Sequence, residues 1–238
     1  MLENLPIYIT AAFVTTTLAT LLLFCWSVKN SQADNVRSKT NKILLSLAIW
    51  LIIQALLTFK NVYNTNTIAF PPKIAIFGVL PAIVTILILF LTKSGKQFID
   101  HLPLQQLTWL HIVRIPVEIV LYCLFLNKAV PEIMTFAGRN FDILAGISAL
   151  FIAYFGFTKQ KLSRRIILIW NFIALALLAN IVITAVLSAP FFIQQFGFDQ
   201  PNIAILYFPF SWLPTFIVPI VLFGHLVSIR QLLKSKKS

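Results

Sequence analysis

Residues 166–189 read IILIWNFIALALLANIVITAVLSA, a stretch without a single charged side chain. An α-helix needs roughly 20 predominantly apolar residues to cross the hydrocarbon core of a bilayer, and about 17 to 25 are tolerated. Inside lipid, every backbone amide and carbonyl must find its partner within the protein, which a helix provides. The stretch therefore predicts a membrane-spanning α-helix.

Six further apolar runs meet the same criterion of length and composition. With residues 166–189 they predict one domain, residues 1–238, folded as an all-α integral-membrane bundle of seven transmembrane helices. The predicted spans are residues 6–28, 43–59, 70–92, 105–126, 141–157, 166–189 and 205–229.

The composition indicates that lipid is the main solvent of the chain. Of its 238 residues, 59% are hydrophobic and 11% are charged, whereas soluble domains contain about 25% charged residues. The net charge of +12 does not indicate nucleic-acid binding, because the basic residues form short clusters between the apolar runs and no continuous basic face. The lipid bilayer is thus an expected partner, and nucleic acid is not.

The distribution of basic residues predicts the orientation of the bundle, since cytoplasmic loops are enriched in Lys and Arg. One side of the predicted bundle carries only Lys60, Lys73, Lys128 and Arg139. The other side carries Lys29, Arg37, Lys39, Lys42, Lys93, Lys96, Lys159, Lys161, Arg164, Arg165, Arg230, Lys234, Lys236 and Lys237. This asymmetry places the N-terminus outside and the C-terminus in the cytoplasm. The compact loops favour a bacterial inner membrane.

The fourth predicted span contains the main candidate site, formed by His111, Arg114, Glu118 and Tyr122. Spacings of three, four and four residues place these side chains on one face of a helix. A charge near the middle of the bilayer costs about 3 kcal/mol on insertion scales, so ionisable residues there usually mark ligand or proton pathways. The sequence therefore predicts a mid-membrane polar site for a small molecule or a proton.

A structural role for the same residues is the alternative. The i,i+4 spacing allows Arg114 and Glu118 to form an ion pair within the helix, which would only fix helix packing. Pro116 favours the functional interpretation, because it removes a backbone donor and frees the carbonyl of Ile112 beside the charged pair. In that interpretation Glu118 is the protonatable group, and Arg114 holds an anionic substrate group or compensates Glu118.

Polar residues on other spans are predicted to support the site, either by lining one common cavity or by forming hydrogen bonds between helices. These supporting residues are Gln54, Asn180, Ser211 and Thr215. Before the fifth span, Asn140 or Asp142 is expected to cap the helix. The alternative is an outer gate formed by Arg139 and Asp142 above Glu118.

The third and seventh spans share a spacing. Leu80-Pro81 is followed by Leu89-Phe90, and Leu213-Pro214 is followed by Leu222-Phe223 at the same distance. This pattern is compatible with two parallel halves joined by the fourth span, as in some transporters, and equally with chance similarity between apolar segments.

The leading functional prediction is a transporter-like or ligand-binding membrane protein, and no cofactor is predicted. An alternative is a redox or enzymatic membrane protein in which His111 and His225, at similar depth on two spans, ligate haem b or a metal ion. An enzyme is not favoured, because neither an HExxH nor a GxSxG pattern is present. A further alternative is an accessory subunit that packs against a membrane partner.

Overall fold

The computed structural model describes residues 2 and 5–234, which fold into helices without any strand. Lys236 and Lys237, used above to predict orientation, lie outside the described residues. Within the described part, five helical segments are long and apolar enough to cross a membrane, which indicates a membrane-embedded protein. They are Ile7–Lys29, Asp34–Phe59, Leu104–Leu126, Arg164–Ser188 and Leu213–Lys234.

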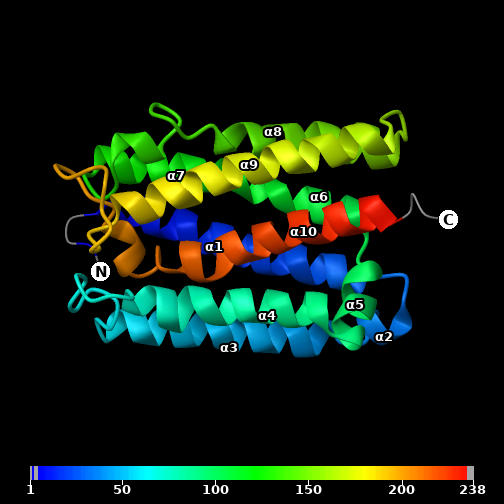
Figure 1. Cartoon of the computed structure of the whole chain (residues 1–238), viewed down its shortest axis with the longest axis horizontal. Helices are drawn as coiled ribbons and strands as arrows, with labels where there is room; N and C mark the ends of the chain where they lie inside the picture. Colours follow the sequence, from blue (N-terminus) through cyan, green and yellow to red (C-terminus); the bar gives the residue numbers. More distant parts are fainter. Residues whose placement is uncertain (1, 3–4, 235–238) are drawn as a thin grey trace.

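Two further apolar segments correspond to the third and fifth predicted spans. Ala75–Leu91 bends by 91° into a following short helix, and this bent pair would raise the number of candidate spans to six. Asp142–Thr158 is apolar but shorter. Both segments lie alongside the long helices, and the connecting loops gather at the two ends of the molecule (Figure 1).

The elements follow one another with few long connections. They are α1 (Ile7–Lys29), α2 (Asp34–Arg37), α3 (Thr40–Phe59), η1 (Ala75–Val79), α4 (Leu80–Leu91), α5 (Lys93–Asp100), α6 (Leu104–Leu110), η2 (His111–Val113), α7 (Arg114–Leu126), η3 (Glu132–Met134), α8 (Asp142–Phe151), η4 (Ile152–Thr158), α9 (Arg164–Ser188), η5 (Ala204–Leu206), η6 (Leu213–Ile217) and α10 (Val218–Lys234). Of the short η elements, η1, η4 and η6 are π-helical, and η2, η3 and η5 are 3-10 turns.

The third and seventh helical segments begin later than the sequence predicted. The predicted spans start at residues 70 and 205, whereas η1 begins at Ala75 and η6 at Leu213. Pro71, Pro72 and Pro209 explain the difference, because proline has no amide donor and disfavours helical backbone in the residue before it. The apolar run continues through these prolines, so hydropathy alone does not reveal where the helix begins.

The core lies around α1 and α10 in the middle of the bundle, where α6 and α7 also pack. Figure 1 shows α8 and α9 on one side of these central helices and the hairpin of α3 and α4 on the other. Large apolar side chains also cover the outside, as shown by Leu22 and Ile169, which are 62% and 57% exposed. Such a surface suits acyl chains rather than water.

The short helix α5 crosses the end of α4 and is tied to the last helix by ion pairs. Asp100 accepts hydrogen bonds from Arg230 at 2.9 and 3.2 Å and from Lys234 at 2.5 Å. Partial burial of Asp100 acts to raise the pKa of its carboxyl, but the bonds from Arg230 and Lys234 outweigh burial and hold the pKa below its ordinary value of 3.8.

Candidate functional site

The centre of the candidate site is a buried ion pair between α7 and α8. Arg114 Nε donates to Asp142 Oδ2 at 2.7 Å, and Arg114 Nη2 donates to Asp142 Oδ1 in the parallel bond of a bidentate pair. The two residues are 2% and 4% exposed. Nη2 also donates to the carbonyl of Ala174 at 2.9 Å, which adds α9 to the contact. Bidentate pairs of this kind fix geometry as well as supplying energy.

Gly146 explains how α8 comes close enough for this pair. It lies one helical turn after Asp142, on the same face of α8. A Cβ atom at Gly146 would lie 2.8 Å from Ile115 Cγ1 and 3.0 Å from the Ile115 amide nitrogen. Because a larger residue would push α8 away from α7, the glycine permits the approach that brings Asp142 to Arg114.

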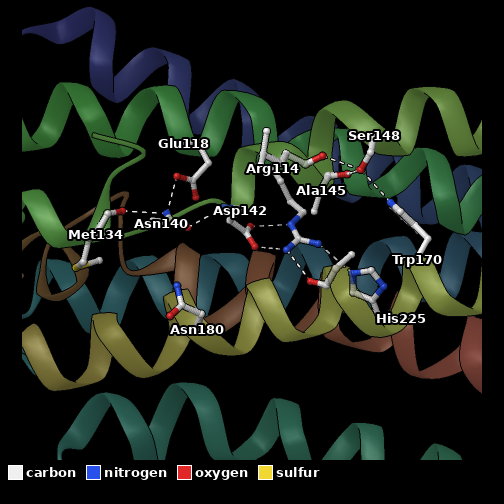
Figure 2. A network of polar contacts seen from close by, with 12 residues as sticks. Arg114, Glu118, Met134, Asn140, Asp142, Ala145, Ser148, Trp170, Asn180 and His225 are labelled. Carbon is white, nitrogen blue, oxygen red and sulfur yellow. Dashed lines mark hydrogen bonds and ion pairs between the residues drawn. The ribbon is translucent and has the colours of Figure 1, made fainter. Parts of the chain in front are cut away.

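His225 extends the network to α10. Arg114 Nη1 lies 3.0 Å from His225 Nε2, and since a guanidinium can only donate, Nε2 is the acceptor. The ring proton of a neutral imidazole is then on Nδ1, which donates to Asn171 Oδ1 at 3.0 Å. The network therefore joins α7, α8, α9 and α10 through one arginine (Figure 2).

His111 belongs to the same centre through stacking and not through hydrogen bonds. Its ring lies on that of His225, with centroids 3.8 Å apart and an interplanar angle of 17°. Both His111 ring nitrogens are buried without a hydrogen-bond partner among the described residues. Gly224 leaves room for the ring, because a Cβ there would lie 3.3 Å from His111 Cε1. Trp170 closes the side of the pair, 5.6 Å from His111 and 5.7 Å from His225 between centroids.

Glu118 lies on the other side of Asp142 and is 1% exposed. Its Oε2 accepts a hydrogen bond from Asn140 Nδ2 at 2.5 Å, and the same amide group donates to the carbonyl of Met134 at 3.0 Å. Asn140 Oδ1 accepts from the backbone amide of Asp142 at 3.0 Å. Figure 2 shows these side chains as a line from Glu118 through Asn140 and Asp142 to Arg114.

The pairing of Arg114 with Glu118 within one helix, considered from their spacing, is not found among the described residues. Arg114 pairs with Asp142, and Glu118 bonds to Asn140. The 3-10 turn η2 immediately before Arg114 tightens the helix at the point where Pro116 withdraws a backbone donor. A partner on another helix can also offer two oxygens in the plane of the guanidinium, which gives bidentate geometry.

The remaining predicted residues near this centre lie around it rather than in it. Tyr122 stacks on Phe136 with centroids 4.7 Å apart and is half-buried. Arg139 is exposed, and its carbonyl accepts a hydrogen bond from the exposed Asn180 at 3.1 Å. No ion pair joins Arg139 to Asp142 among the described residues, because Asp142 points inward to Arg114. The expected cap is not formed in its usual way, since the cap residue of α8 is Phe141 and has no side-chain cap bond, but Asn140 Oδ1 accepts from the amide of Asp142, the first residue of α8.

Gln54, Ser211 and Thr215 form a second network, away from Arg114. Gln54 Nε2 donates to the carbonyl of Phe77 in η1 at 3.1 Å, and its Oε1 accepts from Tyr63 at 2.5 Å. Ser211 bonds to Thr58 at 2.8 Å between hydroxyls. These contacts hold the α3 and α4 hairpin against the chain around η6, and the structure does not bring them together with Arg114 in one cavity.

The two π-helical turns of this second network face each other. Trp50 Nε1 donates to the carbonyl of Thr215 in η6 at 3.0 Å, as Gln54 does to the carbonyl of Phe77 in η1. Trp50 and Gln54 are one turn apart on α3, so one helix face satisfies both irregular turns. Of the two prolines noted from the shared spacing, Pro81 follows η1 at the start of α4, and Pro214 lies within η6. π-Helical turns in membrane helices leave such carbonyls available.

The geometry does not suit haem ligation by His111 and His225. Axial ligands must approach an iron from opposite faces of a macrocycle with their ring nitrogens. Here the two imidazoles are stacked face to face at 3.8 Å, and His225 Nε2 already accepts from Arg114. Among the described residues, no group of three or more His, Cys, Asp or Glu side chains is placed to hold a metal ion.

Residues 71–233 match the model of a family described as a domain of unknown function, DUF8737. The match covers more than half of the chain. The chain belongs to the DUF8737 family. No curated protein and no solved structure matches it. The matched part of this DUF8737 chain includes the whole Arg114 network and leaves out α1 and α3.

Sequence reasoning on the DUF8737 chain missed Asn171 and Trp170 as neighbours of the histidines. Asn171 fixes the ring of His225, and Trp170 Nε1 donates to Ser148 Oγ at 2.9 Å. Both lie in the uncharged run that begins at Ile166, where they are the first polar side chains. A polar residue at that depth indicates an interhelical hydrogen bond, and this signal was available in the sequence.

Proposed function

We propose that this DUF8737 protein is a transporter-like, solute-binding membrane protein in which Glu118 takes up and releases a proton. The observation that carries the proposal is the environment of Glu118, which is 1% exposed and has, within the described part of the chain, one side-chain partner, the amide of Asn140. The nearby Arg114 is already paired with Asp142. A buried carboxylate without a cation of its own is costly, so exchange of a proton at this position changes the energy of the whole centre.

Asn140 links the protonation state of Glu118 to the start of α8. As a carboxylate, Glu118 accepts from Asn140 Nδ2 while Asn140 Oδ1 accepts from the Asp142 amide. A protonated Glu118 keeps one accepting oxygen but gains an O–H donor, and in our proposal this donor binds the side-chain oxygen of Asn140. Turning the amide to offer that oxygen breaks the bonds to Met134 and to the Asp142 amide. Protonation at Glu118 would thereby loosen the residue that holds Arg114, which is the kind of two-state element that coupling requires.

The proposal includes seven spans, with the N-terminus outside, the C-terminus in the cytoplasm, and a location in a bacterial inner membrane. The excess of basic residues on one set of loops supports this orientation. Counting Ala75–Leu91 and Asp142–Thr158 as spans supports the number, since tilted neighbours and a locally thin bilayer accommodate segments slightly shorter than average.

The first test measures proton exchange without requiring a known substrate. Infrared difference spectra of the purified protein between acid and alkaline pH should contain a carboxyl signal that Glu118→Gln removes. Glu132→Gln is the matched control, because Glu132 is exposed near the same end of the bundle. The control should change only a signal typical of a solvated carboxyl group. A spectrum that Glu118→Gln leaves unchanged contradicts proton exchange at Glu118.

The second test measures transport. Proteoliposomes that contain a pH-sensitive dye are exposed in turn to amino acids, sugars, organic acids and nucleosides. At least one solute class should drive proton movement with wild-type protein and with Glu132→Gln, and Glu118→Gln should abolish it while remaining folded. If proton movement is equal in Glu118→Gln and wild type, the assigned role of Glu118 is wrong.

A further inference from the structure

A large apolar groove lies between α3, α4 and α10, on the opposite side of α10 from the Arg114 network. Its volume is about 740 Å³, which falls within the roughly 300–1,000 Å³ of ligand sites. The walls are mainly apolar and include Trp50, Ala82, Leu89, Phe216 and Phe223. Several lining residues on α3 and α4, such as Thr85, are exposed on the outside of the bundle. The groove is therefore open towards the lipid.

The groove has a polar, positively charged end. Lys39 and Lys42, at the start of α3, lie across from Thr92 and Ser94, where α4 meets α5. No acidic residue among those that the structure describes lines the groove. Neither lysine has an ion-pair partner among the described residues. An apolar channel that ends in two unpaired lysines complements a molecule with an apolar body and an anionic head.

The length of the groove matches one leaflet of a bilayer. An α-helix rises about 1.5 Å per residue, so the groove extends about 16 Å along α3 from Lys39 to Trp50. The hydrocarbon core of a bilayer is about 30 Å thick, and half of that is about 15 Å. Its inner end is lined by Trp50 and Thr215, and Trp50 Nε1 donates a hydrogen bond to the carbonyl of Thr215 there. Trp50 lies near the middle of α3, hence near the middle of the bilayer.

We propose that the groove binds one anionic glycerophospholipid from the leaflet at the α2 and α5 end of the bundle. Its phosphate lies between Lys39 and Lys42, and its acyl chains lie along the apolar walls as far as Trp50. The length of one leaflet selects a membrane lipid over a small water-soluble anion. Glu118, Arg114 and Asp142 do not line this groove, so lipid binding can be tested independently of proton exchange at Glu118.

The test is native mass spectrometry of the purified full chain after incubation with equal amounts of phosphatidylglycerol and phosphatidylcholine. Wild-type protein should retain phosphatidylglycerol preferentially. Because each lysine near a lipid surface contributes about fivefold to the binding of an anionic lipid, Lys39→Gln with Lys42→Gln should weaken retention roughly 25-fold. Lys159→Gln with Lys161→Gln removes the same charge outside the groove and should retain the lipid.

Filling the groove tests its apolar part. Ala82→Trp should abolish the phosphatidylglycerol adduct, and Ser46→Trp is a second filling variant at an exposed lining position if Ala82→Trp does not fold. Loss of the adduct in the lysine pair and in a filled variant, with retention in the control pair, supports the site. Equal retention of both lipids by wild type, equal loss in both lysine pairs, or an adduct that survives filling overturns it. Retention of a free fatty acid in place of phospholipid also overturns it.

Discussion

Replacing Asp142 by Asn tests whether the buried ion pair holds four helices together. Asn keeps the shape of Asp142 but offers one oxygen, so at least one of the two charge-assisted bonds from Arg114 is lost, and each is worth about 1.5–3 kcal/mol. The NH2 group of Asn would face an N–H group of Arg114, and two donors cannot form a hydrogen bond with each other. Arg114, 2% exposed, keeps its charge without a counterion. Breaking a buried pair in this way costs about 3–5 kcal/mol.

The loss of stability in Asp142→Asn can be measured by thermal unfolding in detergent. A thiol-reactive fluorophore reports unfolding through Cys25, which is 6% exposed and unpaired in the folded protein. For a chain of this size, about 1 kcal/mol shifts the Tm by roughly 2–4 °C, so Asp142→Asn should lower it by roughly 6–20 °C. Asp199→Asn is the matched control, because Asp199 is exposed in a loop. It should change stability by no more than about 0.5 kcal/mol.

A double-mutant cycle separates the pair from its surroundings. Arg114→Met alone leaves Asp142 buried and charged, and is expected to cost about as much as Asp142→Asn. Arg114→Met combined with Asp142→Leu removes both charges, so the combined loss should be much smaller than the sum of the single losses. Additive losses, or a Tm for Asp142→Asn equal to that of Asp199→Asn, would refute the conclusion that this pair is a structural centre of the bundle.

Two further predictions concern packing and pH. Gly78→Ala should destabilise the protein by about 1–3 kcal/mol in the same thermal assay, because its Cβ would lie 2.3 Å from Thr215 Cγ2, where η1 meets η6. Gly156→Ala, whose Cβ would lie 3.1 Å from the flexible end of Ile167, is the control and should change stability little; equal effects would argue against tight contact at Gly78. The lowered pKa of Asp100 predicts stability that is fully present above its ordinary pKa of 3.8 and is lost as the pH falls through the lower, folded-state pKa. Asp100→Asn should remove that acid-dependent part, up to about 1 kcal/mol, from Tm measured between about pH 2 and pH 7. If Tm falls equally on acidification in Asp100→Asn and in wild type, the prediction is wrong.

The helical, membrane-embedded nature of the chain could be predicted from sequence because it depends on local composition. An uncharged run such as residues 166–189 has one stable arrangement in lipid, and the structure confirms a helix there, Arg164–Ser188. Helix starts were less predictable. Before η1 and η6 the hydrophobic pattern continues, and only the prolines indicate that the backbone is not yet helical. The number of spans and their orientation remain predictions.

The site was harder to predict, because spacing within one helix says which side chains share a face but not which helix lies opposite that face. Arg114 and Glu118 were singled out by the cost of burying charge. Their partners, Asp142 and Asn140, lie at the N-terminal end of α8, where a capping role is the ordinary expectation for such residues. Whether these residues only cap α8 or also bind side chains of α7 depends on how closely α8 approaches α7. Gly146 permits the close approach, because a Cβ atom there would collide with Ile115.

The two polar systems differ in what they leave available to other molecules. Around Arg114, four of the five guanidinium N–H groups and both carboxylate oxygens of Asp142 bond within the protein, whereas the two ring nitrogens of His111 have no hydrogen-bond partner among the described residues. The groove differs from this centre. At its inner end, polar groups of α3 bond to the π-helical turns. At the other end, Lys39 and Lys42 have no ion-pair partner among the described residues. α10 contributes to both, since it carries His225 in the network and Phe223 in the groove wall. The network and the groove nevertheless share no residue, so each can be tested by variants that leave the other intact.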